Sequence, residues 1–211
     1  MVGGVTRALA TDHRTRDDRV KGLVLVVAMV AVMWLEEIVD ELLGGDLDRY
    51  GIVPRTDQGI AGIAAAPFLH AGFGHLISNT VPFLLLGATI ALGGLARVLA
   101  VTVIVALTSG VGTWLVASSG SDHIGASGVV FGFATYLMAR GVYNRSVLEI
   151  AVGVLVVVLF GASLLGGLAP HQGISWQGHL FGAIGGIVAA RVLARKPRRN
   201  EPAGLERFGG V

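Results

Sequence analysis

Long apolar stretches alternate with short polar or charged ones along the whole chain. A helix needs roughly 20 mostly apolar residues to cross the hydrocarbon core of a bilayer. Six stretches approach this length, at residues 22–42, 75–96, 98–118, 125–140, 147–169 and 174–194. The pattern therefore predicts an all-α polytopic membrane protein with six transmembrane helices.

Three of these stretches are less regular than the others. The first turns acidic between Glu36 and Glu41 and could be read as a cleaved signal peptide, but no Ala-x-Ala site precedes the acidic cluster. We therefore expect it to be the first helix. The fourth is short, so the loop before it is expected to dip into the membrane. The sixth needs the polar residues 174–179 to reach across.

The composition supports a membrane location. Of the 211 residues, 53% are hydrophobic and only 14% are charged, whereas soluble domains carry about 25% charged residues. The 32 glycines lie mainly inside apolar stretches, where small residues let membrane helices pack closely. The chain has no cysteine, which excludes disulfides and thiolate metal sites. Neither a metal nor an organic cofactor is implied.

Lysine and arginine predict the orientation. If six helices alternate in direction, all of these residues except Arg49 and Arg55 fall on one side. Because cytoplasmic segments are enriched in Lys and Arg, both termini are expected in the cytoplasm. Membrane topology and attraction to anionic lipids of the bilayer explain the position of these basic residues. Binding to nucleic acid is not needed to explain it. We expect residues 1–21 and 196–211 to be flexible cytoplasmic extensions of a membrane domain at 22–195.

Four polar residues are expected at one depth near the outer ends of three helices. His75 and Asn79 lie one turn apart on one helix face, while Ser127 and His179 lie in the first two turns of their helices. A serine activated by a histidine is a nucleophile, so we interpret Ser127 and His179 as a catalytic pair. His75, Asn79 and the backbone N–H of Ser127 could bind the oxyanion.

Two points favour a Ser–His dyad over a triad. The helices that carry these residues contain no Asp or Glu, and Asp122, although near Ser127 in sequence, is more readily explained as a solvated loop residue. Each polar residue alone could also serve only as a contact between helices. Four of them at one level favour a catalytic site.

These motifs resemble those of the rhomboid intramembrane serine proteases. The matching pieces are His75-x-x-x-Asn79, Gly125-Ala-Ser127-Gly128 and Gly178-His179-Leu-Phe-Gly182, in that order on alternate helices. The resemblance implies a six-helix bundle in which Ser127 is the nucleophile, His179 its base, and His75 and Asn79 line the oxyanion hole. The small Gly178 and Gly182 are expected to bring the last helix close to the helix of Ser127.

The sequence departs from the family in two places. Phe131 stands where the family often has a tyrosine packed on the catalytic histidine, and the first loop lacks the Trp-Arg pair of many bacterial members, with Arg55 after Pro54 instead. We expect His70 and His171 to affect the conformation of the outer loops and to take no part in the chemistry. His123 has no assigned role. The glycine-rich residues 166–173 resemble the loop that caps the family's site.

The expected function is cleavage of transmembrane protein substrates in a bacterial cell membrane, near its outer face. Two alternatives remain: a rhomboid-like protein that binds membrane clients without catalysis, and a small transporter that uses His75 and His179. A non-catalytic client-binding protein would usually lack the Ser or the His, but both are present here. A transporter would often show an internal repeat or carboxylates within the membrane, and the sequence shows neither in the helices concerned.

Overall fold

The fold is known from a computed structural model, which describes residues 2–171 and 173–195, apart from the side chains of residues 2–14. The elements are α1 (Val2–Leu42), η1 (Asp48–Tyr50), α2 (Asp57–Ala65), α3 (Phe73–Ala91), α4 (Leu95–Val116), α5 (Ser127–Asn144), α6 (Val147–Gly167) and α7 (Trp176–Val192). In the described ranges the fold is all-helical, with one isolated β-bridge.

Each of the six apolar stretches corresponds to one long helix, with shifted ends. The second predicted stretch runs to residue 96, but α3 ends at Ala91 because Gly94 adopts φ 88° in the turn before α4. Residues 2–21, expected as a flexible extension, instead continue α1. The short helices η1 and α2 in the first loop were not predicted. The predicted tail, residues 196–211, lies outside the described residues.

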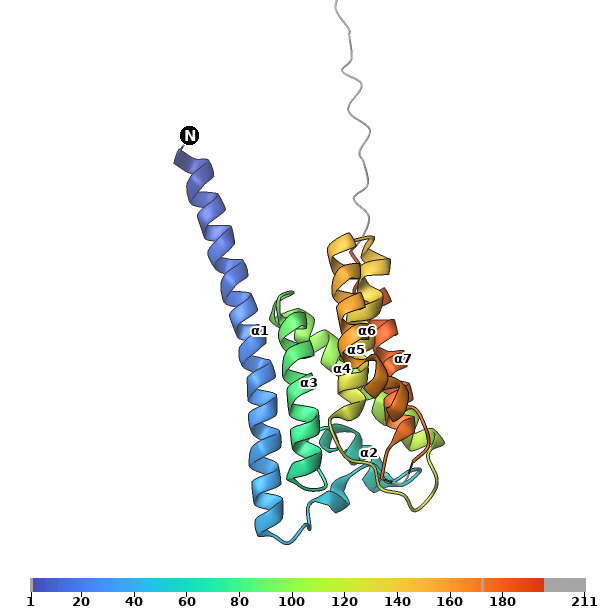
Figure 1. Cartoon of the computed structure of the whole chain (residues 1–211). Coiled ribbons are helices and arrows are strands. Elements are labelled where there is room, and N and C mark those ends of the chain that lie inside the picture. The colour runs from blue at the N-terminus through green and yellow to red at the C-terminus, as the bar shows by residue number, and fades with distance from the viewer. Residues whose placement is uncertain (1, 172, 196–211) are drawn as a thin grey trace, which may run out of the picture.

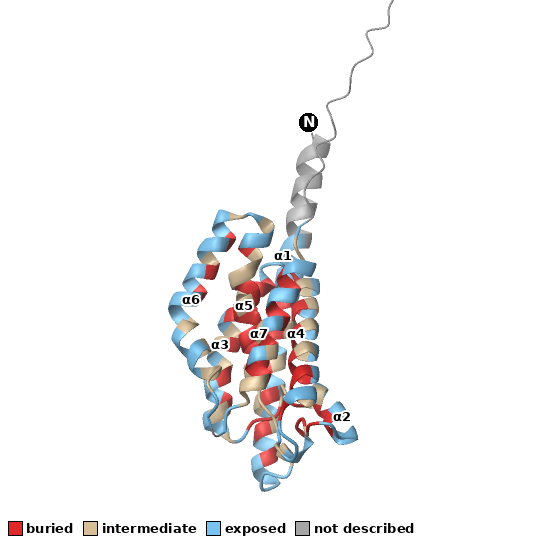
Figure 2. Cartoon of the chain, turned by 90° about the vertical axis from the view of Figure 1, so that its right-hand side faces the viewer, coloured by how far each residue is buried: buried red, intermediate tan, exposed pale blue. Residues whose placement is uncertain are grey.

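The long helices run between two ends of the molecule (Figure 1). Helix α1 lies along α3, and α2 lies at the lower end beneath the bundle. Helices α5 and α7 pack on each other and on α4, and buried residues concentrate on these central helices in Figure 2. Helix α6 packs mainly on α5 and is the most exposed of the long helices.

Four helical segments in the described ranges are long and apolar enough to cross a membrane: Thr15–Leu42, Phe73–Ala91, Leu95–Val116 and Val147–Gly167. Helices α5 and α7 fall outside this group because they are shorter or more polar. Their central position explains the difference, since a helix that faces other helices need not be apolar on every side. Crossing of the membrane by all six long helices stays a prediction.

Glycines set the spacing between α5 and α7. A Cβ added to Gly182 would lie 2.0 Å from the carbonyl oxygen of Gly128, and one added to Gly186 would lie 2.1 Å from that of Gly132. No side chain fits between backbones this close. The two glycine pairs, one turn apart, therefore let α5 and α7 touch along their backbones.

The first loop is tied to the segment that precedes α5. Ile52 and His123 exchange two backbone hydrogen bonds of 2.9 and 3.2 Å, and the Gly125 N–H donates to the Ala66 carbonyl at 2.8 Å. Arg55 donates through Nη1 to the carbonyls of Leu115 and Ala117, which end α4. Arg55 thus anchors the loop although the Trp-Arg pair is absent.

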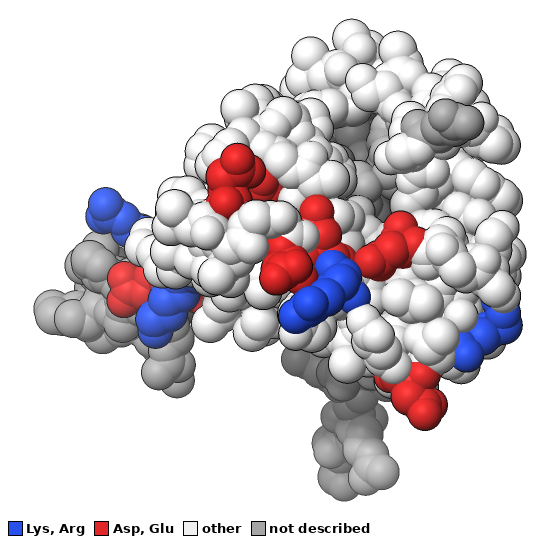
Figure 3. All heavy atoms as spheres, turned by 90° about the horizontal axis from the view of Figure 1, so that it is seen from below, with Lys and Arg blue, Asp and Glu red and all other residues white. Residues whose placement is uncertain are grey.

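Acidic side chains are spread across the lower end of the molecule, with a basic side chain among them near the centre of the view (Figure 3). The acidic end of α1 is part of this face. Glu37 and Asp40 are buried, at 1% and 4% exposure, and Asp40 accepts a hydrogen bond of 2.7 Å from the Leu47 N–H. Asp40, one of the acidic residues in the first apolar stretch, therefore holds the turn that follows α1.

We predict that Gly182→Ala lowers the melting temperature of the detergent-solubilised protein by several degrees. The added Cβ would force α5 and α7 apart, and overpacking of this kind costs about 1–3 kcal/mol. The matched control is Gly161→Ala on α6, where the nearest atom would lie 3.6 Å away and where alanine favours the helix. Equal melting temperatures for the two variants would show that the glycine contact does not hold the bundle.

Candidate active site

Ser127 and His179 lie within hydrogen-bond distance of each other. Ser127 is the first residue of α5 and His179 lies in the first turn of α7. The Ser127 Oγ is 2.7 Å from His179 Nε2. His179 is buried, at 7% exposure, while Ser127 is half-buried. The contact between α5 and α7 therefore brings together the two residues that the sequence analysis paired.

The other ring nitrogen determines the proton arrangement of His179. Its Nδ1 lies 2.7 Å from the carbonyl oxygen of Gly167, at the end of α6. A carbonyl can only accept, so Nδ1 must carry the proton. In the neutral ring Nε2 is then the acceptor and faces the serine hydroxyl. A backbone carbonyl thus orients the histidine, where many serine hydrolases use a carboxylate.

Phe131 and Gly167 hold the ring of His179 from two sides. The Phe131 ring stacks on the imidazole with centroids 4.1 Å apart and an angle of 6°. A Cβ on Gly167 would lie 2.6 Å from Phe131 and 3.0 Å from His179 Nδ1. Phe131 therefore makes the ring contact expected at this position, although it lacks the hydroxyl of a tyrosine. Position 167 has room only for glycine.

His75 and Asn79 reach the same cavity as Ser127 and His179. It has a volume of about 200 Å³ and is lined also by Ile124 and Ser175. His75 Nδ1 accepts the Ala71 N–H at 3.3 Å, which leaves Nε2 as the donor. Asn79 Nδ2 donates one hydrogen to the His75 carbonyl at 3.1 Å and retains a second.

The glycines that surround Ser127 and His179 are closely packed. Gly125 has φ 112°, and a Cβ there would lie 2.7 Å from the His75 ring. A Cβ on Gly128 would lie 2.3 Å from Ser109 Oγ, and one on Gly178 would lie 3.0 Å from Ser175 Oγ. All the supporting residues singled out in the sequence therefore lie around the Ser–His pair.

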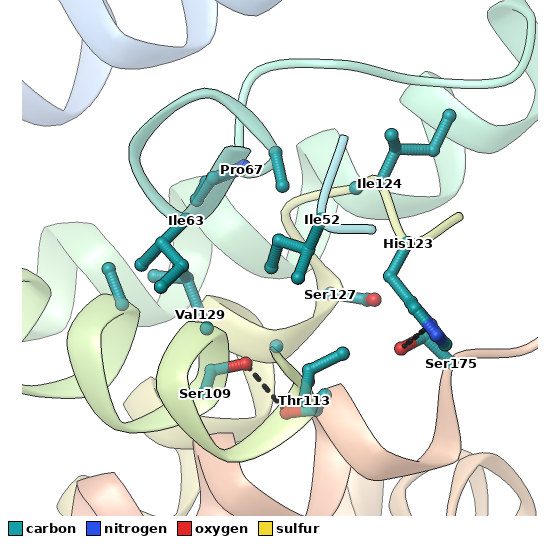
Figure 4. A pocket seen from close by; sticks show the side chains of 16 residues that line it. Ile52, Ile63, Pro67, Ser109, Thr113, His123, Ile124, Ser127, Val129 and Ser175 are labelled. Atoms are coloured by element: carbon teal, nitrogen blue, oxygen red, sulfur yellow. Dashed lines mark hydrogen bonds between the residues drawn. The ribbon is translucent and has the colours of Figure 1, made fainter. Parts of the chain in front are cut away.

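A small cavity lies beside Ser127 (Figure 4). Its volume is about 30 Å³, enough for a water molecule. His123 lines it and contacts Ser175 Oγ through Nδ1 and Ser121 Oγ through Nε2, both at 2.8 Å. This ring, unassigned from the sequence, links the loop before Ser127 to the N-cap residue of α7.

A larger cavity of about 310 Å³ opens between α3 and α6 beside Ser127. Asn79, Pro82 and Leu86 line its α3 side, and Leu159 and Ser163 its α6 side. Both helices are apolar enough to face lipid. Ser127 therefore lines a cavity at the side of the bundle as well as the one that contains His75 and Asn79.

The remaining candidates are placed less centrally. Asp122 and His171 are exposed, and no described hydrogen bond or ion pair joins Asp122 to Ser127 or His179. His70 is fully buried, and its Nε2 accepts the Ala126 N–H at 3.4 Å. Sequence reasoning placed His70 in an outer loop and missed its contact with the residue before Ser127.

In the part of the chain that the structure describes, no group of acidic, histidine or cysteine residues could hold a metal ion.

Comparison with known proteins identifies the family of this chain. Residues 58–196 match the rhomboid domain family. Uncharacterized proteins of Mycobacterium tuberculosis and Mycobacterium leprae are 40% and 41% identical, over 93% and 88% of this chain and 85% and 78% of their own lengths. The putative rhomboid protease YdcA of Bacillus subtilis is 31% identical over 62% of this chain and 66% of its own. The chain belongs to the rhomboid family and is a multi-pass membrane protein.

We predict that His70 makes the fold less stable in acid. Burial and the neighbouring His75 lower its pKa from 6.5 to about 4. Between these values the unfolded chain binds more protons at this position than the folded chain, so stability falls as pH falls below about 6.5. The melting temperature of His70→Gln should therefore decline less than that of the wild type between pH 7 and pH 4. Parallel declines would contradict a buried neutral His70.

Proposed function

We propose that this protein is an intramembrane serine endopeptidase that hydrolyses peptide bonds in or near transmembrane segments of other proteins. The observation that carries the proposal is the chain of two short contacts, from Ser127 Oγ to His179 Nε2 and from His179 Nδ1 to the Gly167 carbonyl. This arrangement leaves Nε2 free to take the serine proton. Membership of the rhomboid family supports the same reaction class.

In the proposed reaction His179 acts as general base and then as general acid. Nε2 takes the hydroxyl proton while Ser127 Oγ attacks the substrate carbonyl carbon. The tetrahedral intermediate collapses as the C–N bond breaks, and His179 returns the proton to the leaving amine. Water, activated by the same nitrogen, then hydrolyses the acyl-enzyme and regenerates the serine.

The oxyanion of the intermediate would lie in the cavity shared by α3 and the start of α5. His75 Nε2, the second N–H of Asn79 and the backbone N–H of Ser127 are the proposed donors. The first-turn amides of α5 have no acceptor within their own helix, and the helix dipole favours negative charge there. Removal of one oxyanion donor typically costs roughly 3–4 kcal/mol of transition-state stabilisation.

We further propose that residues 22–195 form a membrane domain with six crossings and that both termini are cytoplasmic. The alternation of the long helices between two ends supports this topology (Figure 1). So does the distribution of charge, since all Lys and Arg except Arg49 and Arg55 fall at the ends that would face the cytoplasm. The Ser–His pair would then lie toward the outer face.

The proposed site constrains its substrate. A helical segment hides its carbonyls in its own hydrogen bonds, so the segment must unwind before Ser127 can attack. Transmembrane segments with Gly or Pro near the outer end are therefore the expected substrates. The cavity between α3 and α6 is the proposed lateral route to the serine, because it is lined mainly by apolar residues and Ser127 is one of its lining residues.

Labelling of the detergent-solubilised protein by a fluorophosphonate tests the dyad. We expect the wild type to be labelled at Ser127. Ser127→Ala and His179→Ala should lower the labelling rate by roughly 10⁴-fold, because neither keeps an activated hydroxyl. Ser163→Ala, which removes another serine beside the same route, should label like the wild type.

Two outcomes would contradict the proposal. Absence of wild-type labelling in a sample that melts cooperatively would favour a rhomboid-like protein that binds membrane clients without catalysis. Labelling that persists in His179→Ala would show that the histidine does not activate the serine.

A further inference from the structure

Another cavity lies at the opposite end of the bundle from Ser127 and is lined by arginine residues. Its volume is about 320 Å³. Arg97, Arg140 and Arg195 line it together with one carboxylate, Glu149. These residues come from the start of α4, the last turns of α5, the chain after α7 and the first turn of α6. The proposed peptidase reaction uses none of them.

The charges in this cavity do not balance. Glu149 accepts from Arg140 at 2.7 Å and from Asn144 at 2.6 Å, and lies 3.6 Å from Arg195. Arg97 contacts only neutral acceptors, the Tyr136 hydroxyl and the Leu193 carbonyl. Among the described residues that line the cavity, three guanidinium groups thus share one carboxylate, and Arg97 is the one that has no acidic partner.

The guanidinium groups retain donors for a ligand. Arg140 Nε is buried and has no hydrogen-bond partner among the described residues. Arg97 makes both of its hydrogen bonds through Nη1. The planar forks of guanidinium groups suit phosphate oxygens in particular. The chemistry at this end therefore matches a phosphate-bearing anion.

The side walls of the cavity are apolar and belong to helices that can face lipid. Leu92, just after α3, is 65% exposed, and Leu148 on α6 is 76% exposed. Val152, one turn further along α6, also lines the cavity. Helices α3 and α6 both qualify as membrane spans. An anion bound to the arginines would thus have hydrocarbon beside it, between α3 and α6.

We propose that this cavity binds an anionic phospholipid. The headgroup phosphate contacts Arg97, Arg140 and Arg195, and an acyl chain lies against Leu92, Leu148 and Val152. Basic pockets between transmembrane helices are a general form of lipid headgroup site. Free phosphate shares the headgroup chemistry but would leave the apolar wall without a ligand.

Native mass spectrometry of the full chain, released from a neutral detergent, tests the proposal. Phosphatidylglycerol should bind at one saturable site, whereas phosphatidylcholine, which has no net charge, and glycerol 3-phosphate, which has no acyl chain, should not. Arg97→Gln should weaken phosphatidylglycerol binding about tenfold, the effect of one lost charge-assisted contact. Arg191→Gln is the matched control, since Arg191 lies in the last turn of α7 outside the cavity.

Three results would overturn the proposal. Equal binding of phosphatidylglycerol and phosphatidylcholine would remove the role of charge. Equal weakening by Arg191→Gln and Arg97→Gln would show that only the overall charge of this end matters. Binding of glycerol 3-phosphate as tight as that of the lipid would identify the ligand as a soluble phosphate. If Arg97→Gln fails to fold, Arg195→Gln decides between the same outcomes, because Arg195 is 70% exposed and can be replaced without disturbing the core.

Discussion

The direct contact between the backbones of α5 and α7 is the constraint on which the site depends. A residue larger than glycine at 182 or 186 would collide with the carbonyls of Gly128 or Gly132. Glycine is unfavourable within a helix, by about 1 kcal/mol relative to alanine, so four such residues on facing helices are a cost in local stability. In return the helix axes approach closely enough for Ser127 and His179 to meet.

A second constraint connects this contact to α6. The Gly167 carbonyl holds the proton on Nδ1 of His179, and Phe131 limits the ring to one plane. The orientation of the proposed base therefore depends on three helices: α7 carries it, α5 stacks on it, and the end of α6 bonds to it. Helix α6 also forms one wall of the lateral cavity. Helix α6 therefore takes part both in that cavity and in the orientation of the histidine.

Side-chain type and spacing were sufficient to predict the long helices, because apolar length is a local property. Helical periodicity was likewise sufficient to predict that four polar residues lie near the same end of three helices. The end of α3 was misplaced, since a left-handed glycine at 94 stops the helix within an apolar stretch. The role of Gly167 could not be predicted, because a backbone carbonyl leaves no signal in a sequence. Similarly, His70 meets the Ala126 N–H, 56 residues away, and no local pattern reports such a contact. The residues of the arginine cavity come from four separate segments. The distribution of Lys and Arg predicted only that these segments lie on the same side of the membrane, not that their side chains meet.

The most direct measurement of the central claim is cleavage of a defined substrate by the protein reconstituted in liposomes, read by mass spectrometry of the products. The substrate would be a single transmembrane segment with a Gly-Pro break near its outer end, compared with the same segment carrying an uninterrupted leucine run. The account predicts one cut in or beside the broken segment, little cutting of the leucine segment, and none by Ser127→Ala. A product that forms equally with Ser127→Ala, or a broken segment that stays intact with folded wild-type protein, would contradict it.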